Sequence, residues 1–158
     1  MQEKSPLQDP TPADCFKQSE LEMFQSFEIQ VLHTVNYYRW RSETEYAFLF
    51  ALELYFENGE TLLLSSGESS DAIRIIPAQS LVDTARKLQE MHGKTVIQRL
   101  IANTQPLWQG AVGVILQGIQ LSRHEGGLYR NDALLFDFGA HKIAVQLSQK
   151  DGLELLEH

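Results

Sequence analysis

The sequence predicts a single α+β domain, in which one main helix packs on a strongly curved antiparallel sheet of about six to eight strands. Three observations support this fold class. Apolar and polar residues alternate with a period of two in several segments, residues 81–92 carry apolar side chains at helical spacing, and turns rich in glycine separate the alternating segments. A chain of 158 residues, 43% of them hydrophobic, can bury a core without disulfides or a structural metal.

The two ends of the chain are expected to lie outside this domain. Residues 1–19 contain three prolines and few large apolar side chains, so we expect a disordered or loosely attached arm. The last three residues, 156–158, have the sequence Leu-Glu-His and resemble an expression-tag remnant. The predicted domain therefore comprises residues 20–155.

The first half of the domain is predicted to form four strands. Alternation in 27–37 and in 46–56 indicates two long strands, and the even-numbered residues of the second, from Tyr46 to Phe56, are expected on one face. Asn58-Gly59 is typical of a type I′ hairpin turn, which makes 61–65 the return strand. A short strand follows at 72–76 and ends at Pro77.

The helix is predicted at 81–92, after Ser80 as its N-cap. Residues 95–101 suit either a strand or a helix. The second half is expected to add four strands, at 111–122, 132–138, 141–148 and 153–155. Segments 51–75 and 133–155 follow the same order of strand, turn, strand, turn and short strand, which is compatible with two pseudo-repeated meanders.

Charge and cysteine content limit the function classes. The formal net charge of −8 disfavours nucleic acid as a partner and steers the protein towards basic protein partners. No segment has the roughly 18 consecutive apolar residues of a membrane helix, so no membrane partner is expected. The single cysteine, Cys15, excludes an intrachain disulfide and falls in the predicted arm. We therefore expect a cytoplasmic protein without cofactors or bound metal.

Candidate catalytic residues are few. The histidines outside the last three residues, at 33, 92, 124 and 141, do not show metal-ligand spacing. His124, followed by an acid in a loop with two glycines, is the least explained of them. Glu53 and Asp137 could share a sheet face and act as an acid/base pair. If the protein is an enzyme, Glu53, Asp137 and His124 are its candidate acid/base residues.

The most distinctive short segment is 37–41, in which aromatic residues and arginines are interleaved. Such residues are favoured at the centres of protein interfaces. Strand alternation places Tyr37, Arg39 and Arg41 on one face and Tyr38 and Trp40 on the other. In the alternative interpretation, one aromatic row belongs to the core and the arginines pair with nearby acids. Trp108 is a second candidate, which either is exposed or seals one end of the core.

The leading functional hypothesis is a non-enzymatic binding protein, such as a small bacterial immunity-type or neutralising protein that holds a protein partner. Its predicted partner-binding residues are Tyr38, Arg39, Trp40, Arg41 and Trp108. The alternative is a half-barrel that encloses a small molecule, and an enzyme of unknown class comes third. A deep apolar cavity lined by the 46–56 face and the 81–92 helix favours the half-barrel. A flat acidic patch with exposed aromatic residues and no cavity favours the binding protein, and converging carboxylates or a His-Glu pair in a cleft favours the enzyme.

Overall fold

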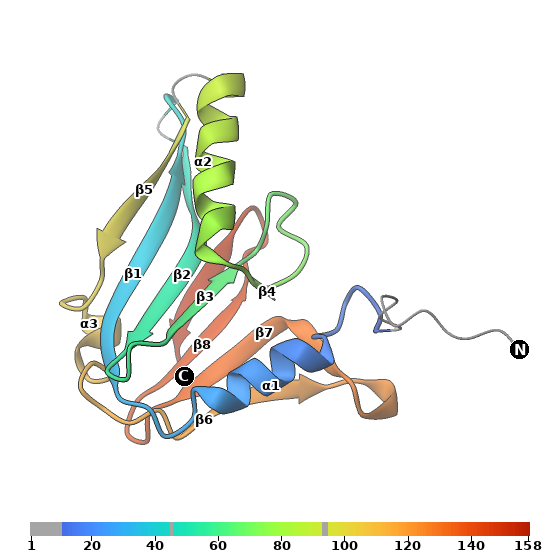
Figure 1. Ribbon diagram of the computed structural model, residues 1–158, viewed down its shortest axis with the longest axis vertical. Coiled ribbons are helices and arrows are strands. Elements are labelled where there is room, and N and C mark those ends of the chain that lie inside the picture. The colour runs from blue at the N-terminus through green and yellow to red at the C-terminus, as the bar shows by residue number, and fades with distance from the viewer. Residues whose placement is uncertain (1–10, 45, 93–94) are drawn as a thin grey trace, which may run out of the picture.

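The computed structural model describes residues 11–44, 46–92 and 95–158 and confirms the α+β class with a curved antiparallel sheet (Figure 1). In these residues the helices are α1 (Gln18–Ser26), α2 (Ala78–His92), α3 (Pro106–Gln109) and the short 3-10 helix η1 (Glu125–Gly127). The strands of the described residues are β1 (Leu32–Arg41), β2 (Ala47–Phe56), β3 (Thr61–Ser65), β4 (Arg74–Ile75), β5 (Val96–Ile101), β6 (Gly118–Arg123), β7 (Tyr129–Asp137), β8 (Lys142–Leu147) and β9 (Leu153–Glu157).

Within the described residues, the nine strands form one sheet that curls into a half-barrel. Its order is β4-β3-β2-β9-β8-β7-β6, and β1 pairs with β2 and with β5. One edge of β2 therefore pairs with β1, while the other pairs with β3 and, at Leu49, with β9. A bridge between Val31 and Ile115 connects the residues before β1 to the residues before β6. The first half of the sheet and the second half are thus joined by the pairing at Leu49 and by this bridge.

A bulge in β2 changes which side chains reach the core. Tyr38 lies opposite Ala51 and Arg39 lies opposite Leu49, so Phe50 is an extra residue in β2. A one-residue offset moves the side chains beyond it to the other face. Leu52, Leu54 and Phe56 accordingly join the main core, whereas Phe48 and Phe50 pack in a second cluster. The prediction that the even-numbered residues from Tyr46 to Phe56 share one face is therefore wrong.

Large side chains fill the inside of the half-barrel. Phe16, Phe56, Trp108 and Phe136 are among the largest fully buried side chains. The second, smaller cluster lies on the outer face of the sheet, where Phe50 and Leu63 pack with Leu81 of α2. Figure 1 shows α2 along the upper part of the sheet and α1 near β6 and β7. The fold therefore has two apolar layers, one on each face of β2.

The prediction of a disordered or loosely attached arm is wrong for residues 11–19, the described part of that segment. Cys15 and Phe16 are fully buried, and Cys15 forms a bridge with Arg130 of β7. The backbone N–H of Phe16 donates to the carbonyl of Tyr129 at 2.8 Å. This segment docks because it contributes an aromatic side chain and backbone hydrogen bonds to the domain. Residues 1–10 lie outside the described residues.

Several element boundaries differ from those predicted. Residues 27–31 form the connection from α1 rather than the start of a strand, and Ile29 there has a φ of +71°. Residues 95–101 contain strand β5, and only the last part of 111–122 is a strand. Leu156 and Glu157, which resemble a tag remnant, pair with β8 as part of β9.

The first hairpin does not have the predicted type I′ turn. That turn needs a positive φ at both central residues, but only Gly59, at +90°, has one, and Asn58 does not. The Gly59 N–H instead donates to the Phe56 carbonyl, and the Asn58 side chain accepts from the N–H of Glu60. Glycine thus occupies the left-handed position that follows an ordinary turn.

None of the helices in the described residues combines the length and apolar character that crossing a bilayer requires.

Candidate functional site

β1 divides the predicted binding segment between two faces, as alternation indicates. Tyr38 and Trp40 join the second cluster beside α2, where the rings of Trp40 and Phe48 stack with centroids 5.2 Å apart. Tyr37 instead packs against the main core, on the opposite face. Trp40 is therefore half-buried beside α2, whereas Tyr37, Arg39 and Arg41 lie on the opposite face of β1.

Tyr38 and Glu53 form a polar contact on the outer face of β1 and β2. One Glu53 oxygen accepts hydrogen bonds from the Asn36 amide at 2.7 Å and from the Tyr38 hydroxyl at 3.2 Å. Burial, followed by the charge and hydrogen bond of Glu53, raises the pKa of Tyr38. Glu53 therefore acts as an acceptor that positions two side chains of β1.

Asp137 is placed elsewhere in the sheet. One of its oxygens accepts from the backbone N–H of Gly139 at 2.8 Å, which stabilises the turn between β7 and β8. Strands β9 and β8 lie between Glu53 on β2 and Asp137 on β7 in the sheet order. The structure therefore does not bring the predicted acid/base pair together.

Trp108 is fully buried, which agrees with the alternative that it seals one end of the core and not with an exposed binding residue. It lies on α3, and its indole N–H donates to the Tyr37 hydroxyl at 2.7 Å. Burial raises the pKa of Tyr37, and the hydrogen bond from Trp108 opposes this shift. Trp108 thus seals one end of the core, and its indole N–H holds the Tyr37 hydroxyl in position.

Tyr37 and Arg39 line an open hollow of about 410 Å³ together with Gln105 and four leucines, Leu49, Leu100, Leu107 and Leu155. Because the Tyr37 oxygen accepts from Trp108, its own proton can be donated into the hollow. Among the described residues, no acceptor meets this hydroxyl proton or the Arg39 guanidinium. The hollow therefore combines an apolar lining with two unused donors, one of them charged.

Arg41 lies beside a second hollow, of about 450 Å³, with Val96 and Gln98 of β5. Its guanidinium donates to the Gln98 side chain at 3.0 Å. None of the described residues that line these two hollows is acidic. This face is therefore locally basic on a protein with a net charge of −8.

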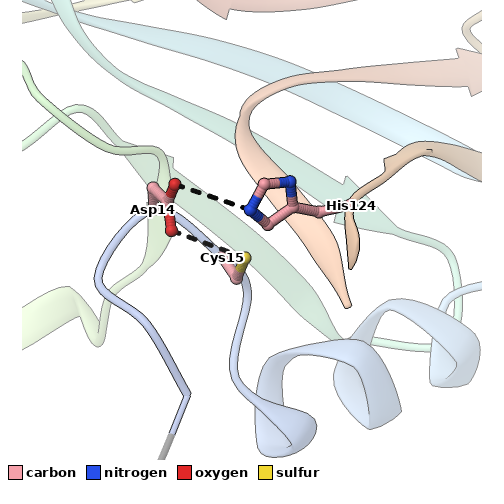
Figure 2. A group of neighbouring side chains, drawn as sticks. All are labelled: Asp14, Cys15 and His124. Carbon is pink, nitrogen blue, oxygen red and sulfur yellow. Dashed lines mark hydrogen bonds and ion pairs between the residues drawn. The ribbon is translucent and has the colours of Figure 1, made fainter. Parts of the chain in front are cut away.

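His124 belongs to a cluster that the sequence did not predict. Figure 2 shows the Asp14 carboxylate with one oxygen directed towards the His124 imidazole and the other towards the Cys15 thiol. The separations are 3.9 Å for His124 Nε2 to Asp14 Oδ2 and 3.6 Å for Cys15 Sγ to Asp14 Oδ1. One ligand atom from each of the three residues lies within 4.8 Å of the others.

The surroundings of Cys15 do not activate it as a nucleophile. Burial is the main cause that raises the pKa of its thiol, and the charge of Asp14 raises it further, while Arg130 and Arg74 oppose the shift. A reactive cysteine instead needs a lowered pKa and solvent access. Residues 14 and 124 are also far apart in the sequence, so no spacing pattern could have revealed this cluster.

A clamp of side chains fixes the backbone next to this cluster. Arg74 donates to the carbonyl of Cys15 at 3.1 Å and to that of Ala13 at 2.8 Å. The amide of Asn131 donates to the same two carbonyls, at 3.3 Å and 2.8 Å. Arg74 is in turn held by Glu20, 2.8 Å away. The position of Cys15 is therefore set by β4, β7 and α1 together.

No protein-family model matches the chain, and neither a curated protein nor a solved structure matches it. The functional argument therefore depends on the residues of the chain itself.

Proposed function

We propose that this protein is a non-enzymatic binding module that holds a partner protein on the face of β5, β1 and β2 opposite α2. The observation that carries the proposal is the hollow in which Tyr37 and Arg39 present donors without an acceptor. Arginine beside apolar and aromatic side chains is the composition typical of an interface centre.

The chemistry of the hollow favours a partner that inserts a carboxylate flanked by apolar side chains. A guanidinium and a hydroxyl can both donate to one carboxylate, and hydrogen bonds to charged groups are stronger than neutral ones. The four leucines would then contact the apolar neighbours of that carboxylate. The proposed ligand group is therefore an aspartate or glutamate side chain in an apolar segment.

The positive charge of this face, rather than the net negative charge of the chain, decides which kind of partner we propose. The net charge of −8 by itself favours a basic partner. However, exposed charges farther apart than about 8 Å are largely screened at physiological salt. Arg39 and Arg41 lie in the contact itself, so we assign the partner's anchoring group an acidic character. We place this binding in the cytoplasm, where a lone cysteine such as Cys15 stays reduced.

The other two hypotheses have less support. A small-molecule carrier needs an enclosed cavity, but Phe56, Trp108 and Phe136 fill the inside of the half-barrel. An acid/base enzyme needs converging carboxylates, and β9 and β8 lie between Glu53 and Asp137 in the sheet order.

Selection from a random peptide display library on the purified protein tests this proposal. We expect the selected peptides to carry Asp or Glu next to Leu, Ile or Phe. Their affinity should fall at least about tenfold in Arg39→Gln, because a charge-assisted hydrogen bond is lost. Arg86→Gln on the exposed side of α2 is the matched control and should bind as the wild type does. Selected peptides without acids, or affinities that Arg39→Gln does not change, would contradict the proposal.

A further inference from the structure

We propose that Asp14, Cys15 and His124 form a binding site for a zinc ion. The site lies where the segment before α1 meets the loop after β6, and it is distinct from the hollow that contains Tyr37 and Arg39. The ligand atoms are Cys15 Sγ, His124 Nε2 and a carboxylate oxygen of Asp14. The proposal does not depend on the binding function argued above.

The separations between the donor atoms are close to those of a zinc site. Zinc bonds of about 2.0–2.3 Å in a tetrahedral arrangement place ligand atoms roughly 3.3–3.8 Å apart. The carboxylate contacts, at 3.6 Å from Cys15 Sγ to Oδ1 and 3.9 Å from His124 Nε2 to Oδ2, end on different oxygens of Asp14. One ligand atom from each residue lies within 4.8 Å of the others, so a rotation of the carboxylate and a small closure bring the set into this range. The side chains of His124 and Asp14 are 31% and 62% exposed, so both have room to make the small adjustment.

The rigid component of the site is Cys15. Its backbone is paired with β7 and clamped by Arg74 and Asn131. A ligand held in this way loses little conformational entropy when a metal binds. The backbone of His124 is also fixed, because its main-chain N–H donates to the carbonyl of Leu128 across the turn formed by η1. Two elements that are distant in the chain therefore present their donors at one place.

The local charge is compatible with a divalent cation. The positive charge of Arg74 is matched by Glu20, and that of Arg130 lies 3.5 Å from Asp132. When zinc binds, the Cys15 S–H bond breaks, its proton goes to solvent and the sulfur electron pair forms the bond to zinc. The thiolate and the Asp14 carboxylate then balance the two positive charges of the ion.

The donor set selects zinc over magnesium or calcium. The latter two prefer oxygen ligands, whereas thiolate and imidazole favour softer metals such as zinc. Three protein ligands leave a fourth position, and the exposed side of Asp14 allows water to occupy it. This arrangement resembles the open coordination of zinc sites that bind a further ligand rather than the closed one of structural sites.

Cobalt substitution tests the site in the full-length chain, prepared without a polyhistidine tag and reduced without a chelating agent. Titration with Co²⁺ should produce a thiolate-to-cobalt charge-transfer absorption that saturates at a single ion per chain and disappears when Zn²⁺ is added. His124→Gln and Asp14→Asn should each weaken cobalt binding by at least about tenfold. Both positions are partly exposed, so these variants test the site without disturbing the core.

Cys15→Ser should remove the charge-transfer band, and circular dichroism establishes whether that variant folds. His33→Gln is the matched control, because the side chain of His33 is exposed and, among the described residues, hydrogen-bonds only to Thr34. The affinity of this variant for Co²⁺ should equal that of the wild type. The proposal is overturned if no charge-transfer band forms with excess Co²⁺. It is equally overturned if His124→Gln and Asp14→Asn bind the ion as the wild type does.

Discussion

The carboxylate of Glu20 lies 2.8 Å from the guanidinium of Arg74 and joins α1 to β4. Its second oxygen accepts from the backbone N–H of Ile75 at 3.1 Å, and its first also accepts from that of Lys17. Glu20 is only 7% exposed, so this ion pair is largely removed from water. One acidic side chain thus connects the N-terminal segment, the first helix and the edge of the sheet.

We predict that Arg74→Met destabilises the protein by about 2–3 kcal/mol. Breaking a fully buried ion pair costs about 3–5 kcal/mol, and the partial exposure of Arg74 reduces this value. The substitution also leaves the carbonyls of Ala13 and Cys15 without the Arg74 donor. Urea unfolding measures the effect. Arg86→Met breaks an exposed pair with Asp83 and should change stability by less than about 0.5 kcal/mol. Equal effects of the two variants would contradict the prediction.

Phe16 provides a second test of the docked N-terminal segment. It is fully buried and packs edge-to-face against Phe24, with ring centroids 5.1 Å apart. We expect Phe16→Ala to lower the free energy of unfolding by about 3–5 kcal/mol, because a large cavity remains. Met23→Ala on the exposed side of α1 should cost well under half of this value. A small effect of Phe16→Ala would show that the segment is loosely attached after all.

These contacts explain why the sequence predicted the sheet better than the N-terminal segment. Alternation identified β7, β8 and the second half of β2 because one face of each of these segments packs in the main core, and that face imposes a period of two. Cys15 and Phe16 are two apolar residues among prolines and acids, and they carry no periodic signal. Their position depends on pairing with Tyr129 and Arg130, which lie far away in the chain.

The candidate sites were predictable only in part. Strand alternation correctly separated Arg39 from Trp40, because β1 has no bulge between them. The burial of Trp108 depends on the position of α3, which no local pattern of the sequence predicted. The contact of Asp14 with His124 depends on the bridge between Cys15 and β7, which places Asp14 beside the loop that follows β6.

Ile29 is a position at which we expect a substitution to stabilise the protein. Its φ of +71° is unfavourable for a β-branched residue, and its side chain is 76% exposed, so it gains little from packing. We expect Ile29→Gly to stabilise the protein by about 1 kcal/mol in thermal and urea unfolding. Ile101→Gly, at an exposed position with ordinary strand geometry in β5, should instead destabilise it. Changes of the same sign in the unfolding free energy of the two glycine variants would contradict this explanation.

The contact of Tyr38 with Glu53 predicts a loss of stability at high pH. Because the pKa of Tyr38 is raised in the folded state, the folded protein holds this proton more tightly than the unfolded chain does. The resulting stability is complete below a pH of about 10, the ordinary tyrosine pKa, and is lost as the pH rises through the folded value. Tyr38→Phe should show a weaker decline of unfolding free energy in this range. An equally steep decline in the wild type and in Tyr38→Phe would contradict this prediction.

Two glycines with similar backbone angles but different surroundings give the sharpest test of the contact between β2 and β9. Gly59 has a φ of +90°, and a Cβ added there would meet no atom within 4 Å. Gly152 has a φ of +79°, but its added Cβ would overlap the backbone carbonyl of Leu49 where β2 meets β9. Backbone atoms cannot rotate away, so the strand pairing itself would have to shift.

We therefore expect Gly59→Ala to cost about 1 kcal/mol, which is the penalty for a left-handed alanine alone. Gly152→Ala should cost on the order of 3 kcal/mol or more, because overpacking adds to the same penalty. Urea unfolding of both variants, with circular dichroism to check the fold, compares them directly. Hydrogen exchange should also become faster in β9 of the Gly152 variant and stay unchanged there in the Gly59 variant. Equal costs at the two positions would mean that β2 and β9 do not approach as closely as the contact of Gly152 with Leu49 requires.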